Sequence, residues 1–173
     1  MLNVFHFRLP ALFLCVVPMV GCWTVKDQVF SVGEGDPLPG AVYLERPGAT
    51  NSGHPMHLSQ IAGTNDFSFS IDGDGPDGCD SNKGTFRAIH IRDDIYVLQI
   101  MCTGNDDYDI QYYSIANGAY HQVQPMEKDT ATSDARNSRY NVKIDENGVI
   151  SGSPSQINAY LRSFKDVANF ENR

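Results

Sequence analysis

Residues 85–124, TFRAIHIRDDIYVLQIMCTGNDDYDIQYYSIANGAYHQVQ, decide the fold. The stretch contains runs rich in Ile, Val, Tyr and Phe at 85–92, 95–102, 108–116 and 119–124. The linkers between them are short and polar, and the last is Asn117-Gly118, a pair that favours the type I′ turn of a β-hairpin. Because connections this short join neighbouring antiparallel strands, the stretch predicts a four-stranded antiparallel meander.

The turn lengths also predict which residues face each other across the meander. The expected pairs are Arg92 with Ile95, Thr85 with Cys102, Cys102 with Tyr108, and Tyr112 with Val123. Since successive side chains of a strand point to opposite faces, one face then carries the core. The residues expected on the core face are Ile89, Ile91, Tyr96, Leu98, Ile100, Ile110, Tyr112 and Val123. The opposite face is expected to carry Phe86, His90, Val97, Gln99, Met101, Gln111, Tyr113 and Gln122.

The second face is a candidate binding surface because tyrosine rings and glutamine amides can contact a glycan or a protein. Its candidate contact residues are His90, Gln99, Gln111, Tyr113, Tyr120 and Gln122. The alternative, which we favour, is that this face packs under the N-terminal strands as the far layer of a sandwich, since a domain of this size normally buries two layers.

Upstream of the meander, three further strands are expected at 41–45, 56–61 and 66–72. The last of these alternates cleanly, with Phe67, Phe69 and Ile71 on one face, as a half-buried strand does. Residues 22–40 are rich in glycine and proline with little periodicity, and their first part is expected to act as a tether ahead of the domain.

Downstream, residues 127–138 are polar and are expected to form a mobile loop. Asn147-Gly148 predicts a small hairpin between 140–145 and 148–151. Ser153-Pro154-Ser155-Gln156 resembles a helix N-cap with proline in the first turn, and an apolar stripe at helical spacing follows it, so a helix is expected over 154–169. The fold class is therefore mainly β, a single domain over 41–173 with six to eight antiparallel strands, sandwich- or barrel-like, and one C-terminal α-helix.

The first 21 residues have the pattern of an export leader. Arg8 is followed by an apolar run from Leu9 to Val20, which is too short to span a bilayer but suits a signal peptide. The run ends in Met19-Val20-Gly21-Cys22, which resembles the lipobox of bacterial lipoproteins, with Met19 where that family prefers leucine. The alternative is an ordinary secretory leader with an incidental cysteine, but no A-x-A cleavage site is present to support it.

The lipobox resemblance implies that the chain is cut before Cys22 and that this cysteine receives diacylglycerol and an amide-linked palmitate-type chain. Two or more acyl chains hold a protein stably on a membrane. In lipoproteins of two-membrane bacteria, aspartate after the cysteine retains the protein at the inner membrane. Trp23 stands there instead, so the resemblance implies the outer membrane, facing the periplasm.

The mature chain is acidic. Without Arg8 it keeps 12 basic and 21 acidic side chains. Such a surface repels nucleic acid and also anionic lipid headgroups. We therefore expect no nucleic-acid partner, and contact with the membrane through the lipid alone.

Two cysteines remain once Cys15 leaves with the leader and Cys22 is acylated. They are Cys79 and Cys102, an even pair in an oxidising compartment, where disulfides persist. We expect them to be bonded to each other. The bond would draw residues 73–84 back over one end of the sheet.

A glycine-spaced acidic loop at 72–80 is the sharpest candidate for a metal. It carries Asp72, Asp74, Asp77 and Asp80, and carboxylate oxygens are what calcium prefers. However, Pro76 stands where a third acidic ligand of an EF-hand loop belongs, and Lys83 stands at the closing glutamate. The favoured interpretation is a solvated acidic turn, with calcium binding as the alternative.

Catalytic patterns find little support in the sequence. There is no G-x-S-x-G elbow and no Walker or Rossmann glycine pattern. His54 and His57 flank a proline, and neither they nor His90 and His121 show metal-ligand spacing. Asp93-Asp94 is explained by a tight turn.

The sequence therefore predicts a membrane-anchored envelope lipoprotein that acts as a non-catalytic binding or accessory module, with no resident cofactor. Its expected partner is an envelope protein or polymer. Two alternatives stay open: a calcium-binding domain built on the 72–80 loop, and an envelope hydrolase whose carboxylates meet only in the folded chain.

Overall fold

The computed structural model describes residues 23–38, 43–44, 56–71, 82–116, 119–167 and 169–172. The strands are β1 (Trp23–Val25), β2 (Tyr43–Leu44), β3 (Met56–Gln60), β4 (Phe67–Ile71), β5 (Lys83–Arg92), β6 (Ile95–Cys102), β7 (Tyr108–Ala116), β8 (Ala119–Met126), β9 (Lys143–Ile144), β10 (Ile150–Ser151) and β11 (Asn169–Asn172). The helices are α1 (Thr130–Tyr140), α2 (Pro154–Arg162) and the 3₁₀ turn η1 (Ser163–Asp166).

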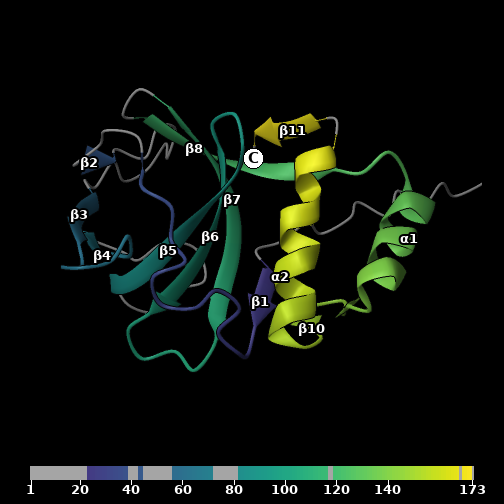
Figure 1. Cartoon of the computed structure of the whole chain (residues 1–173), viewed down its shortest axis with the longest axis horizontal. Helices are drawn as coiled ribbons and strands as arrows, with labels where there is room; N and C mark the ends of the chain where they lie inside the picture. The colour runs from purple at the N-terminus through teal and green to yellow at the C-terminus, as the bar shows by residue number, and fades with distance from the viewer. Residues whose placement is uncertain are drawn as a thin grey trace, which may run out of the picture.

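The predicted meander is the centre of the structure. Its strands β5 to β8 pair in sequence order within a nine-stranded sheet, in which β4, β3 and β2 follow on one side and β11 on the other. The strand β1 pairs with β7 outside this order, and β9 and β10 form a separate small hairpin. The curved sheet does not close into a barrel, and α2 lies beside it with α1 on its outer side (Figure 1). The mainly β fold with a C-terminal helix is thus confirmed, although the described strands outnumber the six to eight expected.

Two of the predicted cross-strand pairs are confirmed and two are wrong. Arg92 faces Ile95 and Tyr112 faces Val123, as expected. Cys102 faces Gly84 rather than Thr85, because an irregularity between His90 and Arg92 adds one residue to β5. A β-bulge of this kind shifts everything beyond it by one position. Cys102 does not face Tyr108 either, because Ile100 pairs with Asp109, one position off the expected register.

The shift in register moves β6 to the other face of the sheet relative to its neighbours. Tyr96, Leu98 and Ile100 share a core cluster with Phe86 and Ala88. Val97 instead packs with Ile89, Ile110, Tyr112 and Val123 under α2. The face assignments predicted for β6 are therefore wrong, and both faces of the meander are buried.

The loop expected at 127–138 is largely a helix, α1. Asp129 caps it by accepting a hydrogen bond from the Thr132 amide at 2.8 Å, and Asn141 ends it in the left-handed conformation. None of its residues is buried, so it has no apolar stripe for periodicity to detect. The Arg136 guanidinium joins the helix to the domain instead, lying over the Phe164 ring at 4.7 Å and pairing with Glu127.

The predicted C-terminal helix is confirmed at its start and corrected at its end. Ser153 and Gln156 form the expected capping box, and Ile157, Tyr160 and Leu161 are buried. The α-helix ends at Arg162, is followed by η1, and gives way to β11 instead of continuing to 169. The residue that ends η1, Val167, is extended at ψ 134°, which directs the chain into β11 against β8.

The N-terminal residues 23–38 belong to the folded domain, which corrects the expected tether. Trp23 pairs opposite Ile110 as part of β1, and its ring lies 5.5–5.9 Å from those of Tyr112, Tyr160 and Phe164. Residues 26–38, which we call the strap, then run across the sheet. Glycine and proline in this region therefore mark a close-fitting loop rather than a free linker.

Candidate functional site

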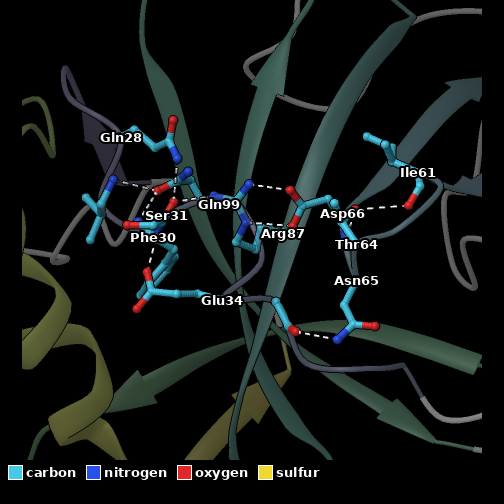
Figure 2. Close-up of polar contacts among 12 residues, drawn as sticks. Gln28, Phe30, Ser31, Glu34, Ile61, Thr64, Asn65, Asp66, Arg87 and Gln99 are labelled. Atoms are coloured by element: carbon cyan, nitrogen blue, oxygen red, sulfur yellow. Dashed lines mark hydrogen bonds and ion pairs between the residues drawn. The ribbon is translucent and has the colours of Figure 1, made fainter.

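The strap is fastened to the sheet by a glutamine of β6. Gln99 is buried, and its Oε1 accepts hydrogen bonds from the backbone N–H groups of Val29 and Phe30 at 2.8 and 2.9 Å. The Val29 and Phe30 side chains are buried in the core under α2. Because buried N–H groups are costly to leave unpaired, Gln99 holds this part of the strap in place (Figure 2).

Next to Gln99 on β5, Arg87 forms a buried ion pair with Asp66. The Arg87 Nε donates to Asp66 Oδ1 at 2.6 Å, and its Nη2 pairs with Asp66 Oδ2. Its Nη1 donates to the Phe30 carbonyl oxygen of the strap. The planar guanidinium thus bridges strap, sheet and the β3–β4 turn (Figure 2), as bidentate arginine geometry allows.

The strap passes directly over this ion pair at Gly35. A Cβ at this position would lie 3.0 Å from the Asn65 carbonyl oxygen and 3.2 Å from Asp66 Oδ1. The Asn65 Nδ2 donates to the Gly35 carbonyl oxygen at 2.8 Å. A side chain here would therefore have to push the turn and the ion pair aside by a few tenths of an ångström, which glycine avoids.

A cleft of about 280 Å³ opens where these elements meet. The strap contributes Gln28 and Val32, the β3–β4 turn contributes Ile61, and β6 and β7 contribute Met101 and Tyr108. Arg87, Asp66 and Gln99 also line it. Since their hydrogen bonds run to one another and to the backbone, these groups give the cleft a rigid polar floor rather than a reactive one.

The rim of the cleft is apolar and unusually exposed. Val32 is 70% exposed, Met101 41% and Ile61 38%. All three side chains also line the cleft, so its apolar rim is open to solvent. The strap and the loop before Tyr108, which contribute Val32 and Tyr108 to the cleft, also carry the exposed residues Asp27, Glu34, Asp106 and Asp107.

The structure separates the residues predicted to share a binding face. Gln99 lies on the opposite side, under the strap, because of the register shift in β6. Gln111 is buried, and it accepts a hydrogen bond from the Tyr113 hydroxyl at 2.8 Å, with the Gln122 amide 3.5 Å away. His90 is exposed and its ring lies 5.1 Å from that of Tyr96. Gln111, Tyr113 and Gln122 therefore form a connected polar group, while the Tyr120 side chain lies outside the described residues.

Asp109 on β7 has a carboxyl group that is less acidic than usual. Burial and the neighbouring Asp107 carboxylate raise the pKa of Asp109 to about 6. Tyr108 lines the cleft, and successive side chains of a strand alternate between faces. Asp109 therefore points away from the cleft, and the residues that form the cleft do not use its carboxyl.

Several predicted site residues lie outside the described part of the chain. They are Cys22, Asp72, Asp74, Asp77, Cys79 and Asp80. Cys102 is 1% exposed and has a bonded partner, but its pairing with Cys79 stays a prediction. Within the described ranges, no three His, Cys, Asp or Glu side chains gather closely enough to hold a metal ion. The 72–80 loop lies outside those ranges, so calcium binding there stays a prediction.

The cleft itself could not be found from the sequence. Its residues come from separate segments and match no motif. The available signal is Val32, an apolar residue next to Gly33 and Gly35 in the stretch expected to be a tether.

None of the helices in the described ranges has both the length and the hydropathy needed to cross a bilayer. No protein-family model matches the chain, and no curated protein or solved structure matches it either.

Proposed function

We propose that this protein is a lipid-anchored envelope lipoprotein whose domain is a non-catalytic binding module, and that the cleft beside the strap is its contact surface. The anchor rests on the lipobox resemblance that ends at Cys22. The observation that carries the binding role is the exposed apolar rim of Val32, Ile61 and Met101 above a floor of mutually bonded polar groups.

The partner that fits this cleft best is a protein segment with apolar and basic side chains. Apolar groups would cover the rim and gain about 25 cal/mol per Å² of surface removed from water. The exposed carboxylates of Asp27, Glu34 and Asp106, in the two segments that supply Val32 and Tyr108 to the cleft, would favour basic groups, which speeds and directs association. The buried floor supplies shape, since the Arg87 guanidinium and the Asp66 carboxylate are paired with each other and Gln99 Oε1 is bonded to the strap.

Site-specific photo-crosslinking in intact cells tests this proposal. A photoreactive amino acid at Val32 should capture a defined protein partner, identified by mass spectrometry. The matched control places the same amino acid at Asp134, an exposed position on α1, and should not capture that partner. Equal capture at both positions, or none at Val32, would remove the cleft as the contact surface.

A further inference from the structure

We infer that the anchor and the cleft are rigidly linked, so that the cleft opens at the surface of the bilayer and its partner is a membrane-proximal protein segment. This inference rests on the proposed lipidation of Cys22 and on the cleft being the contact surface. The inference gives the position of the cleft relative to the bilayer, and this position limits which proteins can bind there.

No flexible linker separates Cys22 from the folded domain. Trp23, next to Cys22, is already part of β1, opposite Ile110. Its ring packs among Tyr112, Tyr160 and Phe164, and aromatic contacts of this kind stabilise by about 0.5–1.5 kcal/mol each beyond burial. Consecutive Cα atoms are about 3.8 Å apart, so a lipid on Cys22 would sit beside the domain itself.

The strand β1 lies next to a residue that lines the cleft. Val25, the last residue of β1, lies opposite Tyr108, and Tyr108 lines the cleft. Two residues of strand span about 7 Å and paired strands lie about 5 Å apart. The path along the backbone from Cys22 to Tyr108, which lines the cleft, is therefore at most roughly 16 Å.

Both β1 and the strap are held firmly in the domain. Val25 is fully buried, and the Thr24 amide donates to the Gly148 carbonyl oxygen at 3.2 Å. Beyond β1, the strap is fixed by Gln99 and Arg87. A longer separation between the anchor and the cleft would require β1 to leave the sheet and expose the buried Val25.

Charge favours a protein over the lipid surface itself as the occupant of the cleft. Residues 23–129 contain six basic and 16 acidic side chains, whereas residues 130–173 contain six basic and five acidic ones. The part that forms the cleft therefore repels anionic headgroups. A juxtamembrane protein segment with basic side chains meets both the charge and the position of the cleft.

Energy transfer to the bilayer surface tests this inference. The full chain, produced with its own leader and purified from membranes, is placed in vesicles that carry an acceptor dye on the headgroups. A fluorescent amino acid at position 32 is the donor. The parent is compared with a variant that has 20 Gly/Ser residues inserted between Cys22 and Trp23. This spacer has an r.m.s. end-to-end distance of about 25 Å. The same run appended after Arg173 is the matched control.

Transfer should be efficient in the parent and the control, and should fall about twofold or more in the inserted variant, since the spacer adds about 25 Å. Equal transfer in parent and inserted variant, with Cys22 shown to be acylated by mass spectrometry, would overturn the rigid link while leaving the anchor intact. Absence of acyl mass on Cys22 would overturn the anchor, and this inference with it. Loss of the Val32 crosslink in cells on insertion of the spacer would support a membrane-proximal partner, and an undiminished crosslink would exclude one.

Discussion

At the scale of single residues, Arg87 matters most to the site because it joins the strap, the sheet and the β3–β4 turn. Removing one member of a buried ion pair leaves the other charge uncompensated, which costs about 3–5 kcal/mol. Arg87→Met should therefore lower the free energy of unfolding by about that amount in urea titration. Arg139→Met, the same change at an exposed position of α1, should cost less than about 1 kcal/mol.

A second change separates the charge from the packing. In Arg87→Met/Asp66→Leu neither charge remains buried, so part of the stability should return relative to the single variant. If Arg87→Met were no more destabilising than Arg139→Met, the ion pair would not hold the floor of the cleft together.

Asp109 gives the domain a pH dependence. Its pKa of about 6 in the folded chain lies above the usual 3.8, so the folded state binds its proton more tightly than the unfolded state does. Stability from this group is therefore present below about pH 4 and is lost as the pH rises through about 6. Asp109→Asn should stabilise the protein by about 1–2 kcal/mol at pH 7, after discounting for the solvent screening of a half-exposed carboxyl.

The advantage of Asp109→Asn should vanish near pH 4, where the native carboxyl is itself protonated. Urea unfolding at a series of pH values measures this, with Asp134→Asn as a control for losing an exposed carboxylate. An Asp109→Asn protein that is less stable than the parent at pH 7 would show that the carboxylate is favoured in the folded state, contrary to this account.

At the scale of elements, the strap depends on Gln99. Gln99→Leu would leave the Val29 and Phe30 amides buried without their acceptor, at a cost of about 1–3 kcal/mol for each. Amide hydrogen exchange by NMR should then speed up at Val29 and Phe30 while it changes little at Ile110 in the sheet, since the strap can detach locally.

The control for the strap is Gln124→Leu, at a half-buried glutamine of β8 whose amide contacts the Met126 sulfur at 3.6 Å. It should leave exchange in the strap unchanged. Uniformly faster exchange across the sheet in Gln99→Leu would mean that the strap and the sheet unfold together.

The elements also show what a sequence can and cannot reveal. Alternation and the hairpin turns locate the strands of the meander, and the Ser153–Gln156 cap locates α2, because these signals are local. The bulge near Ile91 leaves no local mark, so the faces of β6 were predicted wrongly. The helix α1 was missed because Arg136 attaches it through a guanidinium instead of an apolar stripe.

At the scale of the whole molecule, the cleft is a product of chain segments far apart in sequence. Gly35 looked like a linker residue, yet its role is to let the backbone pass over Asp66 and Arg87. Buried polar pairs between distant segments have no periodicity and no motif. Composition, charge and the leader therefore suggested the class of protein and its expected location, whereas the contact surface needed the folded chain.

If an anchored domain uses its cleft to hold a partner at the membrane, capture of that partner must depend on the anchor. Photo-crosslinking from Val32 in intact cells measures this, in parent and Cys22→Ala proteins present in equal amounts. We expect a defined protein partner captured by the parent and lost, or reduced at least several-fold, in Cys22→Ala. Equal capture by both proteins, or none by the parent, would contradict it.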